Sequence, residues 1–292
     1  YLVWQVRDEW GQLRYQLRHP EYLLLAIAAA VLAIVVSAWI WRGLIPRNGR
    51  PPFGQILALY LQGILWNNVL PGGMGGDVVR AAGLWAGSGQ GATAVGSVLM
   101  ARLAGLWSVV LLAMGAALAA ASALGWAEAR LLIGGTALIL ALTAAATFLL
   151  FSRPVSALAA RLPGRWRSLY EGLRTYGDRP AILLQVLGWS LTVQMCAVAV
   201  NALTARALDL PITAGMLLLA VPLVSLSVMV PISIGGFGLR EGAYLTFLGL
   251  FGVRAGDALV LSLAVFTLLT LVSAAGAALC RLLVAPEKTI TA

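Results

Sequence analysis

The stretch Asn67-Asn68-Val69-Leu70-Pro71-Gly72-Gly73-Met74-Gly75-Gly76-Asp77-Val78-Val79-Arg80 decides the fold that this sequence predicts. Its hydrophobic run breaks at a proline, crosses a cluster of glycines, and restarts with an acid and a base in one helical turn. The same skeleton, Pro-x3-Gly-Gly-x3-Arg, returns 160 residues later as Pro231-Ile232-Ser233-Ile234-Gly235-Gly236-Phe237-Gly238-Leu239-Arg240-Glu241. Pro20 and Pro180 share that offset, and each begins an apolar helix. The sequence therefore predicts two structural repeats, each made of an apolar helix, a broken hydrophobic segment and a further apolar helix.

The composition is that of an integral membrane protein. Of the 292 residues, 61% are hydrophobic and only 11% are charged, and the mean hydropathy is +0.91. Soluble domains carry about 25% charged residues, so this chain would expose too much apolar surface to stay dispersed in water. In a membrane protein the net charge of +9 marks cytoplasmic loops and contacts with anionic headgroups. The expected partners are therefore membrane lipids with anionic headgroups, and nucleic acid is not expected.

No cofactor and no metal are expected. The single histidine, His19, precedes a membrane helix, so no cluster of histidine and cysteine ligands can form. Cys196 and Cys280 both lie in apolar runs, where they are expected to be small buried hydrophobic residues. The sequence begins at Tyr1 without a methionine, and we expect residues upstream of it.

The expected fold class is all-α: a polytopic helical bundle with two inverted repeats, each containing a re-entrant segment broken by glycine and proline. Residues 1–292 form a single transmembrane domain, with repeat one over about 20–124, a linking span and basic loop over 130–179, and repeat two over about 180–284. Full spans are expected at 21–41, 92–124, 130–151, 180–206 and 255–284. Residues 1–20 and 161–176 are expected to form amphipathic helices at the membrane surface.

The symmetry of the repeats depends on whether residues 53–70 cross the membrane. The restart at 77–86 is too short to cross it, which favours a re-entrant hairpin. Three full spans then separate Pro20 from Pro180, where the two repeats begin, and this odd number makes the repeats inverted. If residues 53–70 cross completely, the number is four and the repeats are parallel. The distribution of arginines favours the first topology, with the loop 152–179 on the cytoplasmic side of a bacterial or archaeal inner membrane.

Paired broken segments of this kind indicate the binding site of a transporter. Each proline ends a half-helix, because it lacks an N–H group and clashes with the preceding turn. The glycines allow close approach of the backbone to a ligand. The restarting half-helices present free N–H groups and the positive end of a dipole, which suits a phosphate or a carboxylate.

Three arginines are expected inside the membrane, near two carboxylates. Each costs roughly 2.5–3.5 kcal/mol on insertion scales, so such residues face the bundle interior and form pairs. Asp77 as a helix N-cap and Arg102 as a purely structural ion-pair partner are alternatives that stay open. Three cations against two anions leave one positive charge, which favours an anionic ligand. The candidate binding residues are Asn67, Asn68, Gly75, Gly76, Asp77, Arg80, Arg102, Ser233, Gly235, Gly236, Arg240 and Glu241.

These motifs resemble those of the lysylphosphatidylglycerol-synthase transmembrane-region family, the flippase-like membrane domain of the multiple peptide resistance factor and its standalone relatives. The similar motifs are Asn67-Asn68-x2-Pro71-Gly72 with its continuation to Arg80, then Arg102-Leu103-x-Gly105, then Pro231 to Glu241. The resemblance runs over about residues 15–284. It implies a bundle that moves, or helps to move, a lipid with a charged headgroup between leaflets. The aminoacyl-transferase domain of the full synthase is not in this sequence, so lysyl transfer is not expected of this chain.

The leading functional hypothesis is a lipid flippase that takes an anionic or charged-headgroup lipid, of phospholipid or polyprenyl-phosphate type. One alternative is a membrane partner of a lipid-modifying pathway that transports nothing. A further alternative is a polyprenyl-phosphate-dependent glycosyl- or phosphotransferase, which the scattered single carboxylates disfavour, because metal-dependent versions need clustered acids. The protein is therefore expected not to be an enzyme. Its protein partner could be a second copy of the chain or a lipid-synthesis enzyme.

Overall fold

The computed structural model describes residues 17–47, 50–69, 75–122, 124–159, 161, 163–177, 180–229 and 236–283. Across these ranges the regular structure consists of eleven α-helices, without a strand. Five of the helices are long and apolar enough to cross a membrane: α2 (Pro20–Leu44), α5 (Gly91–Ala120), α6 (Trp126–Phe151), α9 (Pro180–Ala207) and α12 (Ala255–Leu283). This confirms the predicted polytopic helical bundle. The predicted surface helix at residues 1–20 falls almost wholly outside the described residues.

The other helices are shorter. The first broken segment comprises α3 (Phe53–Val69) and α4 (Gly75–Ser88), and the second comprises α10 (Ala214–Val228) and α11 (Leu239–Gly249). The 17 residues of α3 span about 25 Å at 1.5 Å per residue, less than a hydrocarbon core of about 30 Å. Two further helices, α7 (Arg153–Ala159) and α8 (Gly164–Gly177), occupy the predicted basic loop.

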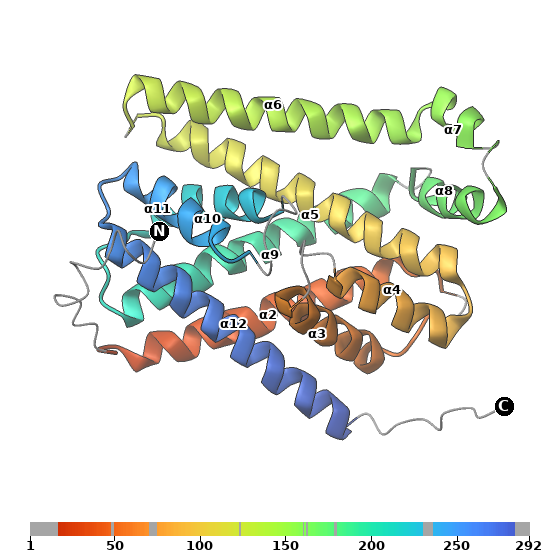
Figure 1. Ribbon diagram of the computed structural model, residues 1–292, viewed down its shortest axis with the longest axis horizontal. Coiled ribbons are helices and arrows are strands. Elements are labelled where there is room, and N and C mark those ends of the chain that lie inside the picture. Colours follow the sequence, from red (N-terminus) through yellow and green to blue (C-terminus); the bar gives the residue numbers. More distant parts are fainter. Residues whose placement is uncertain are drawn as a thin grey trace.

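The order and packing of the helices repeat. The series α2, α3, α4, α5 returns as α9, α10, α11, α12. The partners return as well, because α3 packs against α12 and its counterpart α10 packs against α5, while α2 and α9 pack against each other. In Figure 1 the α3–α4 pair lies toward the end of the bundle that holds α8, and the α10–α11 pair lies toward the other end.

The counterparts α2 and α9 run antiparallel. The backbone N–H of His19, just before α2, donates to the carbonyl of Ala207 at the end of α9. Near the other end of the pair, the Trp39 and Trp189 rings meet edge to face, with centroids 5.3 Å apart. Antiparallel counterparts are what inverted repeats require. The orientation of the repeats across a membrane, and a re-entrant path for α3 and α4, stay predictions.

Small residues allow the central helices to pack closely. Ala26 and Ala30 of α2 are buried in one core with residues of α9, α10, α11 and α12. In membranes, side chains of this size let helix backbones approach each other. The outer helix α6 is different, because large side chains such as Leu131 and Phe148 are exposed along it. Such an apolar outer surface suits contact with lipid chains.

The α3–α4 hairpin is held by a contact between two backbones. Gly63 of α3 and Gly76 of α4 face each other so closely that a Cβ atom on Gly76 would overlap the carbonyl group of Gly63. A Cβ on Gly63 would lie 2.9 Å from the carbonyl oxygen of Gly76. Because the obstacle is backbone, no side-chain rotation relieves it. Glycine at both positions is what brings the first turn of α4 against α3.

We expect Gly76→Ala to destabilise the protein by about 1–3 kcal/mol, the range for overpacking a well-packed site. This corresponds to a fall of several degrees in the melting temperature measured in detergent. Gly87→Ala is the matched control in the same helix, because a Cβ there meets nothing within 4 Å. A Gly76→Ala protein that melts with the Gly87→Ala control would contradict the close contact.

Candidate functional site

The site is built around the start of α4, where the chain resumes after the first break. The side-chain Oδ1 of Asn67, in the last turn of α3, accepts a hydrogen bond of 2.7 Å from the backbone N–H of Gly76. It thereby satisfies one of the N–H groups that a helix leaves free at its beginning. Gly75 and Gly76 are both buried there. The sequence predicted that the N–H groups at this helix end bind a phosphate. One of them, that of Gly76, instead donates to the side chain of Asn67.

Asp77 pairs with two arginines rather than capping the helix. It lies in the first turn of α4, which begins at Gly75, so the interpretation of Asp77 as N-cap is wrong. Its Oδ1 accepts from Nη2 of Arg80, three residues later in the same helix, and its Oδ2 accepts from Nε of Arg102 in α5. The carboxylate is only 14% exposed. The structure thus shows the ion pair expected between Arg102 and a buried acid, and adds Arg80 to it.

Arg80 is enclosed by aromatic rings as well as by the carboxylate. Its guanidinium carbon lies 4.9 Å from the ring centroid of Tyr60 and 5.7 Å from that of Trp41. Both distances are in the range of cation–π attraction. The Nε of Arg80 is buried and makes no hydrogen bond within the described part of the chain. A donor without an acceptor in so enclosed a place is costly, and a bound anion would satisfy it.

The second repeat builds a similar arrangement from different residues. Gly236 and Gly238 have φ of +77° and +79°, a conformation that glycine adopts without strain, and α11 begins directly after them. Glu241, 6% exposed, accepts from the N–H of Gly238 at 2.6 Å and from Nη2 of Arg240 at 2.5 Å. Glu241 is thus both the cap of α11 and the partner of its arginine.

Arg240, like Arg80, lies against two aromatic rings. Its guanidinium carbon is 4.2 Å from the ring centroid of Phe266 and 5.5 Å from that of Phe237. Its Nε also donates to the hydroxyl of Ser262 in α12 at 3.3 Å. In both repeats, therefore, an arginine just after the break is held by a carboxylate of its own helix and by two aromatic faces.

A cavity of about 420 Å³ brings the two repeats together. Asn67 and Arg102 line it from repeat one, and Gly236 and Arg240 line it from repeat two. Its other walls are mainly apolar. Pockets for small ligands have volumes of about 300–1,000 Å³, so this one has room for a headgroup. Two of the three predicted membrane arginines therefore reach a common space.

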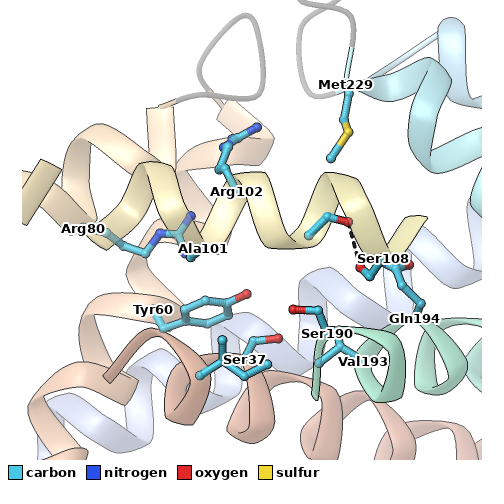
Figure 2. Close-up of a pocket in the computed structure, with 12 residues that line it drawn as sticks. Ser37, Tyr60, Arg80, Ala101, Arg102, Ser108, Ser190, Val193, Gln194 and Met229 are labelled. Carbon is cyan, nitrogen blue, oxygen red and sulfur yellow. Dashed lines mark hydrogen bonds between the residues drawn. The ribbon is translucent and has the colours of Figure 1, made fainter. Parts of the chain in front are cut away.

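A second cavity of about 210 Å³ lies on the side of Arg80. Figure 2 shows the hydroxyls of Tyr60, Ser37 and Ser190 gathered opposite α5, which carries Arg102 and Ser108. A third, mainly apolar space of about 220 Å³ shares Ser37 and Tyr60 with this cavity. It shares Asn201, among others, with the 420 Å³ cavity. Shared walls make the three spaces neighbours in the centre of the bundle.

Several residues of these cavities were not among the candidates. Asn201 accepts a hydrogen bond of 2.6 Å from the hydroxyl of Tyr244, and both are buried. Gln194 lines the cavity of Arg80. A sequence signal for Asn201 and Gln194 exists, because each is a polar residue within the apolar run of α9. The aromatic partners of the arginines carry no such signal, since rings are common throughout an apolar chain.

The structure places eight of the twelve candidates around these cavities or at the helix starts beside them: Asn67, Gly75, Gly76, Asp77, Arg80, Arg102, Gly236 and Arg240, and Glu241 joins them through Arg240. Ser233 and Gly235 lie outside the described residues, as does the side chain of Asn68. Across the described ranges no three histidine, cysteine or acidic side chains are grouped as metal ligands.

Comparison with known families decides the membership of the chain. The family model described as Lysylphosphatidylglycerol synthase TM region matches residues 1–276. The chain belongs to this family. No curated protein and no solved structure matches it significantly. The resemblance inferred from the motifs is therefore confirmed for the family as a whole. The chain is a multi-pass membrane protein of a lipid-related family.

In this member of the lysylphosphatidylglycerol synthase TM region, we expect Asp77→Asn to leave Arg80 and Arg102 without a compensating charge. Removing one partner from a buried ion pair costs about 3–5 kcal/mol, so the melting temperature in detergent should fall steeply. Arg102→Gln added to Asp77→Asn should cost less than the sum of the single changes, because the two residues share one interaction.

Arg167→Gln is the matched control, because Arg167 pairs with Glu171 at 2.8 Å while both side chains are more than half exposed. Exposed pairs contribute about 0.2–1 kcal/mol. Strict additivity of Asp77→Asn and Arg102→Gln would show that the ion pair carries no coupling energy.

Proposed function

We propose that this protein is a lipid flippase, which moves a lipid with an anionic or charged headgroup between the two leaflets of a bacterial or archaeal inner membrane. The observation that carries the proposal is the cavity of about 420 Å³ reached by Arg102 from one repeat and by Arg240 from the other. Transfer of a charged headgroup through lipid alone is slow, because burying an unpaired charge is expensive. The two arginines in this otherwise mainly apolar cavity would supply the missing partners.

The charge balance of the site favours an anion. Arg80, Arg102 and Arg240 carry three positive charges, and Asp77 and Glu241 supply two negative ones. One phosphate would complete the balance without displacing either carboxylate from its pairs.

The apolar walls favour a ligand that also has a hydrophobic part. The space that joins the two arginine cavities is lined by residues such as Ile34, Ile64 and Leu269. A soluble phosphate ester gains nothing from these walls, whereas the upper part of a lipid chain does. The headgroup would occupy the central cavities while most of the acyl chain stays in the bilayer.

We further propose that the chain is not an enzyme. Asp77 and Glu241, the two acids of the site, come from different repeats, and each is already paired with arginine. Metal-dependent transfer chemistry uses carboxylates that converge on one point. The pairing of each acid with a guanidinium supports a binding role for both.

The test is reconstitution in phosphatidylcholine liposomes that contain a fluorescent phosphatidylglycerol, with dithionite bleaching of the outer leaflet as the readout. We expect the wild-type protein to speed exchange of this lipid, and Arg102→Gln combined with Arg240→Gln to slow it at least tenfold. Fluorescent phosphatidylcholine should exchange more slowly than phosphatidylglycerol, because it lacks the net negative charge.

Arg130→Gln is the control for the loss of an arginine, because Arg130 is exposed on α6 and lines none of the central cavities. Wild-type rates from the double variant would overturn the proposal, as would the absence of exchange by the wild-type protein. Conversion of an added polyprenyl phosphate to a product of different mass, detected by mass spectrometry, would instead support the transferase alternative.

A further inference from the structure

A large cavity outside the central site is lined by residues near the end of α2, the end of α8 and the start of α9. Its volume is about 870 Å³, and residues 45–47 and Arg50, which follow α2, line it as well. The hydroxyl of Tyr176 in α8 donates to the carbonyl of Leu44 in α2 at 2.7 Å and so closes one side. Ile40 lines both this cavity and the 210 Å³ cavity of Arg80.

The polar side of this cavity is positively charged. Arg47 and Arg50 line it, and among the described residues that line it none is acidic. Segment 42–52 contains a third arginine, Arg42, and no acid. Burial lowers the pKa of Arg50, and the positive charges of Arg42 and Arg47 lower it further. The arginines therefore repel one another, and a bound anion would relieve that repulsion.

Arg50 is fixed in place rather than free to follow any nearby anion. Its Nε and Nη2 donate to the carbonyl of Ile45 at 2.8 and 2.5 Å, and Nη2 also reaches the carbonyl of Gly43 at 3.4 Å. These bonds satisfy carbonyl groups that a helix leaves free at its end. Arg50 makes no further bond to a described residue through Nη1, so that nitrogen remains a donor for a ligand. Arg47 is exposed beside it.

The opposite side of the cavity is apolar and aromatic. The edge-to-face pair of Trp39 and Trp189 lies here, with the two residues 45% and 40% exposed, and Ile182 and Val186 continue the wall. Tryptophan is enriched where membrane proteins meet the headgroup layer. Cationic and apolar walls in one cavity match a molecule with a phosphate at one end and a hydrocarbon chain at the other.

We propose that this cavity is a docking site for an anionic phospholipid, with its phosphate between Arg47 and Arg50 and the start of an acyl chain against Trp39 and Trp189. From here the headgroup is one side chain, Ile40, away from the cavity of Arg80. The inference deepens the proposed flippase function and rests on it for the onward movement of the lipid. The docking itself is measured by binding alone.

A different binding pattern is expected if these arginines only fix the orientation of the chain in the membrane. Arginines that merely attract anionic lipids to the cytoplasmic face act additively and without a defined chain position. Lipid binding in a defined cavity depends instead on one arginine more than on the neighbouring arginines. It also depends on the free volume beside that arginine. Charge and volume can therefore be tested separately.

The experiment uses the full chain in nanodiscs with a photoactivatable phosphatidylglycerol, and mass spectrometry to map the cross-linked peptides. We expect cross-links at the end of α2 and in the first turns of α9, and weaker ones from the matching phosphatidylcholine probe. Arg47→Gln should reduce them about tenfold, equivalent to about 1.4 kcal/mol, because it removes a charged donor to the phosphate. Gly43→Phe should reduce them by filling the cavity, since a Cβ on Gly43 meets nothing within 4 Å.

Arg174→Gln is the matched control, because Arg174 is exposed at the end of α8 and does not line the cavity. Equal loss with Arg174→Gln, unchanged cross-links in both cavity variants, or equal labelling by phosphatidylcholine would each overturn the docking site. Loss of the cross-links on adding sodium phosphate, but not sodium chloride of equal ionic strength, would assign the site to free phosphate instead.

The two proposals fail in different ways. Arg102→Gln combined with Arg240→Gln should slow lipid exchange at least tenfold and leave the cross-links at the docking site unchanged. Arg47→Gln should lower both the cross-links and the rate of exchange. Exchange at the wild-type rate in a protein that has lost these cross-links would show that lipids reach the centre by another path.

Discussion

Asp77 holds two guanidinium groups with one carboxylate, and much of the first repeat is arranged so that this sharing can occur. Arg80 must stand one turn after Asp77 in α4, while Arg102 must reach it from α5. Both requirements depend on α4 beginning where it does, against α3, with Asn67 bonded to its first turn. In a low-dielectric interior, an arginine without such a partner would be strongly unfavourable. The carboxylate therefore makes two partly buried cations tolerable, yet one negative charge does not neutralise both.

The second repeat solves the same problem with other side chains. Glu241 bonds both its neighbouring arginine and the backbone of Gly238, so a single acid serves as cap and counter-ion. Aromatic faces accompany the arginine in each repeat, although Tyr60 and Trp41 in one correspond to Phe237 and Phe266 in the other only by role. What the halves share is an arrangement of charge, carboxylate and ring around a chain break, and not a set of matched residues. That arrangement is compatible with the anion binding that we propose.

The sequence was sufficient for the helices and for most of the charged residues of the site. Long apolar runs and the 160-residue offset predicted the five spans and the order of the shorter helices, because burial in lipid imposes a strong compositional signal. Arginines and acids within those runs stood out for the same reason. The role of Asp77 was not decidable, since a cap and an ion-pair partner use the same residue at the same place. The rings around Arg80 and the cavity at Arg47 and Arg50 were not predictable either, because they depend on which helices become neighbours.

The contact between Gly63 and Gly76 has a mechanical consequence. Helices that touch through side chains can slide, because rotamers change as they move, but two backbones in contact have no such freedom. The α3–α4 hairpin should accordingly travel as a single lever. The contact between this hairpin and α12 can adjust more easily, because the side chain of Leu61, and not backbone, lies against Gly276. If the central cavities open alternately to the two faces of the membrane, we expect the movement to occur at this contact between α3 and α12.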